Sequence, residues 1–156
     1  RGRLVMTGER PLLLVLAEVF AAEAYFALAR TKPEPLITAL TRMIAADEAR
    51  HGASFFAYAR RAIAKSAQPD RERLDAVKVL HFWLNEAQAV SHPVNETMEK
   101  LKSILPEGGA LPRFVPPAER ICRLVGALTG LPIAKPADVE PHLYALTKQV
   151  HAQALV

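Results

Sequence analysis

Hydrophobic residues recur along this chain every three to four positions, the spacing of α-helices that bury one face. A first helix is predicted over about residues 10–30, with Pro11 in the favoured first turn, and a second over about residues 35–65. Helix-breaking residues at 31–33 end the first segment and reverse the chain. The pattern therefore predicts a long antiparallel helical hairpin over residues 10–66.

After the hairpin the pattern is shorter and more interrupted. A third helical stretch is broken at Ser91-His92-Pro93 and then resumes, because proline disfavours helical backbone in the residue before it. The sequence contains no internal repeat and no low-complexity segment, so we treat residues 1–156 as one domain. The predicted divisions after the hairpin are a broken third helix at 71–105, a loop at 106–117 and further helices at 118–156.

Composition favours an all-α fold. Apolar residues make up 51% of the chain and aromatic residues 6%, and the apolar positions are mainly Ala, Leu and Val, which favour helices over sheets. A chain of 156 residues can bury a sizeable core. The aromatic residues that we expect in this core, as packing and not as a radical or electron-transfer site, are Tyr25, Phe26, Phe55, Phe56, Phe82 and Trp83. The single cysteine, Cys122, excludes an internal disulfide and favours a reducing, cytoplasmic location. Any metal ion must therefore be bound by oxygen and imidazole ligands.

The charge balance is modestly basic. Lys and Arg total 20 against 16 for Asp and Glu, a formal net charge of +4 that favours acidic partners. Arg60, Arg61 and Lys65 form the densest basic cluster, near the end of the second predicted helix. Because no aromatic side chains alternate within it to stack on bases, we expect no nucleic-acid binding. The cluster is instead a candidate docking patch for an acidic protein.

One segment, residues 11–29, is strongly apolar and has nearly the length of a membrane span. Glu18 and Glu23 lie inside it, and charged side chains near the middle of a spanning helix are costly. We therefore expect a buried helix of a soluble protein and no membrane span.

A carboxylate and an imidazole are placed together on the second predicted helix. Glu48 and His51 are three residues apart, about 60° around the helix axis, so their side chains converge. Their face continues through an apolar stripe, so two ionisable groups project where a core is expected, which requires a partner or a metal ion. The stripe consists of Ile44, Ala45, Gly52 and Phe55.

The first predicted helix offers two acidic residues as the neighbour of this pair. Glu18 and Glu23 are five positions apart, about 140° around the axis, so they cannot both face the second helix at one place. Counted from the turn, Glu18 falls within roughly 1.5 Å of the level of Glu48, whereas Glu23 is offset by about 9 Å. Helical bundles build dinuclear metal sites from Glu-x-x-His pairs and lone Glu residues. The predicted ligands are therefore Glu18, Glu48 and His51, with Glu23 supporting them or bonding between helices.

Residues 44–51, with the sequence IAADEARH, resemble the second iron-binding motif of the soluble acyl-carrier-protein desaturases and their ferritin-like relatives. In that family a Glu about 30 positions upstream, one antiparallel hairpin away, supplies a further ligand, and Glu18 stands at that place. Ser91-His92-Pro93 and the segments 122–124 and 128–131 resemble the C-terminal part of these enzymes.

The resemblance implies a ferritin-like helical bundle in which the hairpin is half of a four-helix di-iron core. Carried over by position, it makes Glu18, Glu48 and His51 iron ligands, with manganese as the alternative metal. Asp47 would accept a hydrogen bond from a ligating histidine on a facing helix, and Arg50 would pair with a neighbouring carboxylate. The implied activity is that of a di-iron oxygenase or desaturase, which uses O₂ on an apolar substrate such as a fatty acyl chain held by acyl carrier protein.

The chain departs from the family because it carries one Glu-x-x-His pair where a complete site has two. Three explanations stay open: a missing N-terminal half or separate chain completes the bundle, two copies pair about a two-fold axis to give four Glu and two His, or the hairpin binds no metal. The corresponding functions are an oxygenase or desaturase, an iron-binding or iron-oxidising homo-oligomer with an interface site, and a structural protein.

Overall fold

The computed structural model of the chain describes residues 9–31, 34–85 and 116–154. Within these residues every regular element is a helix and none is a strand, which confirms the predicted all-α class. The break predicted at 91–93 and the helix expected after it lie outside the described residues. The elements are α1 (Glu9–Arg30), α2 (Pro35–Lys65), α3 (Pro69–Asn85), α5 (Ala118–Thr129), the short 3-10 helix η1 (Pro136–Asp138) and α6 (Val139–Gln153).

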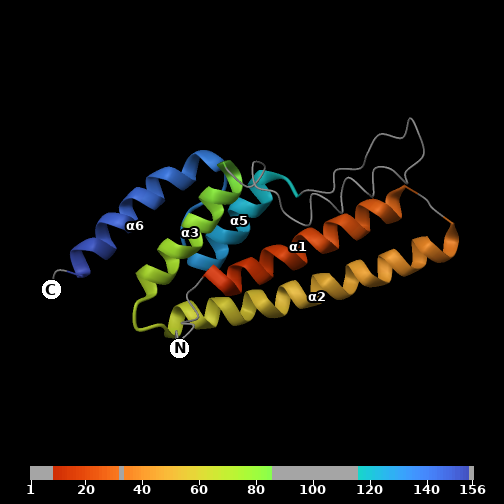
Figure 1. The fold of residues 1–156 in the computed structure, drawn as a ribbon, viewed down its shortest axis with the longest axis horizontal. Helices are drawn as coiled ribbons and strands as arrows, with labels where there is room; N and C mark the ends of the chain where they lie inside the picture. The colour runs from red at the N-terminus through yellow and green to blue at the C-terminus, as the bar shows by residue number, and fades with distance from the viewer. Residues whose placement is uncertain (1–8, 32–33, 86–115, 155–156) are drawn as a thin grey trace, which may run out of the picture.

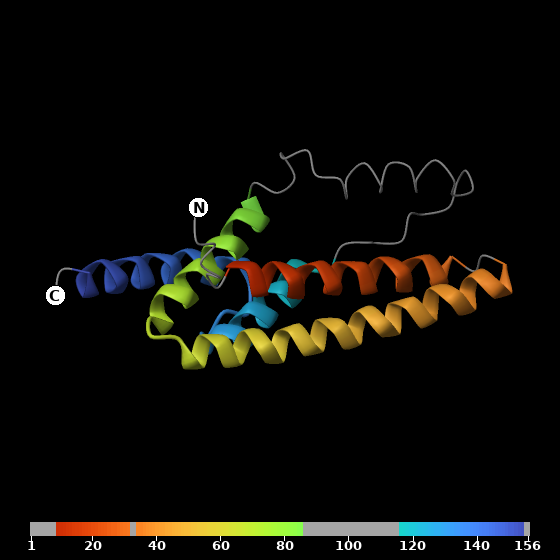
Figure 2. The same cartoon turned by 60° about the horizontal axis from the view of Figure 1, so that its bottom comes forward.

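α1 and α2 lie side by side as a long antiparallel hairpin, at the place where the sequence predicts one (Figure 1, Figure 2). Small residues on both helices are buried along the line where they meet, and because these side chains are so short, the two backbones approach closely. These residues are Ala22 and Ala29 on α1, with Ala45, Gly52 and Ala59 on α2.

The helix ends follow from local hydrogen bonding. At the start of α2, with a proline in its first position, the Glu34 carboxylate accepts the backbone N–H of Ile37 at 3.2 Å. At the end of α5, Gly130 adopts a left-handed backbone with φ of 73°, which glycine reaches without steric cost. This conformation lets the N–H of Leu131 donate to the carbonyl of Gly126 at 3.1 Å.

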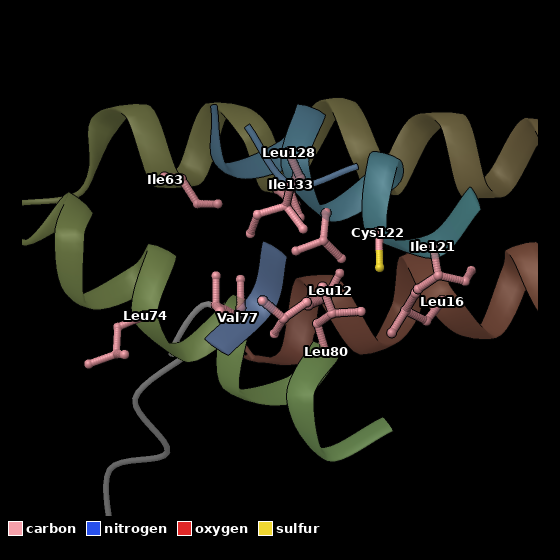
Figure 3. Close-up of a cluster of buried hydrophobic side chains, with 14 of the residues drawn as sticks. Leu12, Leu16, Ile63, Leu74, Val77, Leu80, Ile121, Cys122, Leu128 and Ile133 are labelled. Atoms are coloured by element: carbon pink, nitrogen blue, oxygen red, sulfur yellow. The ribbon is translucent and has the colours of Figure 1, made fainter. Parts of the chain in front are cut away.

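The hydrophobic core forms where the C-terminal helices pack on one end of the hairpin, the end at which α1 begins and α2 ends (Figure 1). Figure 3 shows Leu12 of α1, Leu80 of α3 and Ile121 of α5 within one cluster. All three side chains are fully buried. Cys122 lies in the same cluster, and burial raises the pKa of its thiol, with smaller contributions from nearby carboxylates. The thiol therefore behaves as a small apolar group.

One carboxylate joins α6 to α3. Asp70, at the start of α3, accepts hydrogen bonds from Gln149 at 2.6 Å and Gln153 at 3.1 Å, both on α6. The same carboxylate pairs with Arg73 at 2.9 Å on its own helix. Arg73 in turn donates to the carbonyl of Thr129 at 3.1 Å, which connects α3 to the end of α5.

Two aromatic side chains are not where the sequence places them. Phe26 is 39% exposed and Phe82 is 44% exposed, whereas both are predicted to be core residues. Trp83 does meet the expectation, since it packs edge-to-face on Phe20 with 5.3 Å between ring centroids. Helical periodicity identifies an apolar side chain but does not show whether another element covers it, and these two are only partly covered.

Within the described residues, one helical segment, Leu12–Arg30 of α1, is long and apolar enough to cross a membrane by length and composition alone. A third of that segment is buried inside the protein, and the core helix of a soluble protein meets the same criterion. This observation is weak support for either environment.

The burial difference on α3 gives a direct test of the core. Replacing buried Leu80 with alanine removes a fully enclosed side chain, so we expect Leu80→Ala to lower the free energy of unfolding by about 2–5 kcal/mol. Phe82→Ala, on the same helix, is the matched control and should cost less, because 44% of Phe82 is already exposed to water. Urea denaturation followed by circular dichroism measures both. Equal losses would contradict the orientation of α3.

Candidate metal centre

Three side chains from the two hairpin helices converge at one point. Glu18 comes from α1, and Glu48 and His51 come from α2; each offers a ligand atom, and these atoms lie within 4.8 Å of one another. Ligands bonded at about 2.0–2.2 Å to a single ion are separated by roughly 3–4 Å, so only small side-chain adjustments bring the three to one ion. The structure thus assembles the three residues that the sequence analysis selects.

The helix places Glu48 and His51 together without any distortion. They are separated by less than one turn, and the His51 Nδ1 atom lies 3.3 Å from the Glu48 Oε2 atom. The Glu48 side chain is 25% exposed and the His51 side chain 61% exposed. The imidazole is therefore open to water, while the glutamate is partly covered.

The two glutamates influence each other electrostatically. The pKa of Glu18 is raised, chiefly by the hydrogen bond that its carboxyl group forms with Glu48, then by burial and by repulsion from the Glu48 charge. His51 acts in the opposite direction. Two carboxylates this close favour either a shared proton or a cation between them. The donor set of two carboxylate oxygens and one imidazole nitrogen is suited to Fe²⁺ or Mn²⁺ and leaves coordination positions open.

Gly52 permits the close contact on which this cluster depends. A Cβ atom built on Gly52 would lie 3.4 Å from Glu18 Cβ and 3.9 Å from a Val19 methyl carbon. The backbone of α2 therefore passes directly against the stem of Glu18, one turn beyond Glu48. The sequence analysis includes Gly52 only as part of an apolar stripe, and its special role depends on a contact between helices that periodicity does not show.

Glu23 does not belong to the cluster of candidate ligands. Its carboxylate pairs with Arg120 of α5 at 2.7 Å and with Arg30 at 3.2 Å. The structure puts Glu18, not Glu23, beside Glu48, as the residue count from the turn predicts. Of the two roles expected for Glu23, support of the ligands or bonding between helices, the observed contacts match the second.

Asp47 and Arg50 form an ion pair on the outer side of α2. Arg50 thus pairs with a neighbouring carboxylate, as the resemblance implies, and the pair also has the i,i+3 spacing of ordinary surface pairs. The facing histidine expected to donate to Asp47 has no counterpart among the described contacts of Asp47. The role of Asp47 beside a metal ion stays a prediction.

The surroundings of the cluster differ from the expectation that it projects into a core. Ile44 and Phe55, which flank it on α2, are only partly buried, and His51 is mostly exposed. The core residues Leu12 and Leu16 lie more than about 100° around α1 from Glu18, on the side that meets the C-terminal helices. The expectation holds for Ala45 and Gly52, which are buried. It is wrong for Ile44, Phe55 and His51, because the main core forms on the other side of the hairpin.

The basic cluster lies farther along α2. Arg60, Arg61 and Lys65 are exposed, and Arg60 is twelve residues from Glu48, roughly 18 Å along the helix axis. Arg60 and Arg61 line a shallow depression of about 420 Å³ together with Phe56, Ala57 and Ala64. The cluster is therefore accessible to a partner but separate from the candidate ligands.

Comparison of the chain with protein-family models, with curated proteins and with solved structures gives no significant match.

Substitutions at Gly52 test the contact between the helices. Gly52→Ala places a methyl group in ordinary van der Waals contact with Glu18 and adds helix propensity, so we expect unchanged or slightly higher stability. Gly52→Val introduces branches that must displace Glu18, and we expect a loss of about 1–3 kcal/mol. Urea denaturation of the metal-free proteins provides the comparison. Equal stability of the two variants would show that the helices do not touch here.

Proposed function

We propose that the hairpin supplies one half of a dinuclear carboxylate metal centre of the ferritin-like kind, which oxidises an apolar substrate with O₂. The observation that carries the proposal is the convergence of Glu18, Glu48 and His51 from two helices on one point. The resemblance of residues 44–51 to an iron-binding motif supports it independently, because that motif assigns ligand roles to Glu48 and His51.

Each side chain has a distinct part in this proposal. Glu18 and Glu48 supply negative charge, which offsets the charge of a divalent ion, and His51 supplies a neutral nitrogen ligand. Ile44 and Phe55, partly buried beside the candidate ligands, offer apolar surface to an apolar substrate. When bound, the metal pair supplies the redox chemistry for the reaction of O₂ with a C–H bond. Iron is the expected metal, with manganese as the alternative.

The basic cluster supports a more specific substrate class. An acyl chain carried by acyl carrier protein would be delivered by an acidic protein, and Arg60, Arg61 and Lys65 offer it an exposed cationic surface on the helix that bears Glu48. We propose this surface as the docking site of the carrier.

Two other functions remain as alternatives to an oxygenase or desaturase. The same ligands serve an iron-binding or iron-oxidising oligomer without an organic substrate, which the solvent exposure of His51 favours. A structural protein that keeps the hairpin without metal would also contain Glu48 and His51 as an ordinary ion pair. Metal binding distinguishes the structural protein from the oxygenase or desaturase and from the iron-binding oligomer, because only the structural protein binds no metal.

Metal binding gives the primary test. Saturating Fe²⁺ under anaerobic conditions, or Mn²⁺, should raise the melting temperature of the protein; at a hundred times the dissociation constant the gain is about 2.7 kcal/mol. Glu18→Gln, Glu48→Gln and His51→Ala should each weaken metal binding by more than about 10-fold, because each removes a ligand. Calorimetric titration and thermal denaturation measure both effects.

Glu23→Gln is the matched control, because it removes a carboxylate from the same helix without touching the candidate ligands. It should keep the full response to metal, although it loses the ion pair with Arg120. If the natural protein shows no response to metal and Glu48→Leu/His51→Leu is more stable than it, the metal proposal is wrong and the structural function stands.

Charge reversal tests the docking surface. Arg60→Glu/Arg61→Glu should weaken binding of an acidic acyl carrier protein by more than about 10-fold at low salt, and the difference should shrink at high salt. Arg42→Glu, which changes another exposed arginine of α2, should have little effect. Titration calorimetry at two salt concentrations measures binding of the carrier protein by each variant. If Arg42→Glu weakened binding as much as Arg60→Glu/Arg61→Glu, the carrier would be attracted to positive charge in general and not to this surface.

A further inference from the structure

The side of the hairpin that carries the candidate ligands is apolar and open. We define this open face by the described side chains of residues 12–30 and 35–65 that lie within about 80° of Glu18 or Glu48 around their helix axes, on the side towards His51. Because the helices are antiparallel and both right-handed, the same rotation on each reaches the same side of the hairpin. Besides the three ligands, the face consists of Leu14, Ala21, Tyr25 and Leu28 on α1 and Ile37, Leu40, Ile44, Phe55, Tyr58 and Ala62 on α2.

Large exposed apolar side chains concentrate on the hairpin. Ten such side chains are found among the described residues, and eight of them belong to α1 or α2. Four of the eight lie on the open face: Leu14, Ile37, Leu40 and Tyr58. On the open face, Tyr58 is 52% exposed, Leu40 is 43% exposed and Ile37 is 41% exposed. An apolar surface of this extent is typical of an interaction site.

The size of the open face is sufficient for a stable interface. α1 has 22 residues, which gives a length of roughly 33 Å, and two adjacent helices are about 20 Å wide. Their footprint of roughly 660 Å² approaches the about 800 Å² that each partner buries in a standard protein–protein interface.

The charges on the open face determine what can cover it. Among the described side chains of this face, those with a formal charge at or near neutral pH are Glu18, Glu48 and His51. An apolar partner without a cation would bury two carboxylates at a high cost in desolvation. A second identical face would bring two more carboxylates, and two divalent cations would then balance the four negative charges.

We infer that the open face binds a second copy of this chain about a two-fold axis, and that the divalent metal ions couple the two copies by completing one dinuclear site between them. This inference rests on the proposed metal function. Each copy supplies one lone Glu and one Glu-x-x-His pair, so the dimer contains the four Glu and two His of a complete site. The apolar residues around the ligands then pack on their equivalents and keep water from the metal ions.

Sedimentation analysis of the full chain with and without Mn²⁺, combined with elemental analysis, tests the inference. We expect the mass of one chain, 17.1 kDa, without metal, and twice that mass with one Mn²⁺ per chain. Leu40→Glu and Tyr58→Glu should each raise the dissociation constant of the metal-bound dimer by more than about 10-fold, because each places an uncompensated charge in the interface. Both positions are roughly 12–15 Å along α2 from Glu48, so the ligands themselves are unchanged.

Tyr144→Glu on α6 is the matched control, since Tyr144 is 74% exposed and lies outside the open face. It should leave the dimer unchanged. A metal-bound protein that keeps the mass of one chain would overturn the pairing but leave metal binding intact. A dimer that forms equally well without metal and with Glu48→Gln/His51→Ala would overturn the coupling to metal. A single chain that binds no metal would contradict both this inference and the proposed function.

Discussion

The close packing of α1 on α2 is the contact on which the candidate site depends. The ligands come from both helices, so their separation is set by the distance and register between two backbones and not by any loop. Ala45 and Gly52 keep that distance short on α2, and Ala22 does so on α1. Gly52 matters most because it passes against the stem of Glu18. A branched side chain at Gly52 would displace Glu18 and so change its distance from Glu48.

The two sides of the hairpin have opposite characters. On one side, Leu12 and Leu16 join the core built with the C-terminal helices, and Arg120 reaches Glu23 across the edge of that core. On the other side, apolar residues surround a cluster of two carboxylates and an imidazole that are partly in water. Charged groups within an apolar surface are costly in most assemblies. One side of the hairpin is therefore buried in a core, and on the other side ionisable groups lie within an apolar surface.

Much of the fold follows from the sequence because helices and their ends have local causes. The hairpin and the choice of Glu18 over Glu23 needed only the rise and rotation of an α-helix and the position of the turn. Burial was harder to predict. Phe26 and Phe82 belong to apolar patterns but stay exposed, and His51 faces water where a core was expected.

The reason is that periodicity describes one helix at a time, whereas burial depends on what lies opposite. Gly52 illustrates the same limit, because its contact with Glu18 joins residues 34 positions apart in the sequence. Likewise, the ion pair between Glu23 and Arg120 connects residues 97 positions apart. Which face is apolar can be read from the sequence; which face is covered depends on the tertiary arrangement.

The attachment of α6 has a consequence for how the molecule opens. Only Val139 and Leu146 of this helix are buried, and the Asp70 hydrogen bonds that hold its far end are exposed to water, which replaces them at little net cost. Opening of α6 therefore exposes far less apolar surface than separation of the hairpin. We therefore expect α6 to open more readily than the hairpin, with faster exchange of its amide hydrogens with solvent than those of α1 and α2.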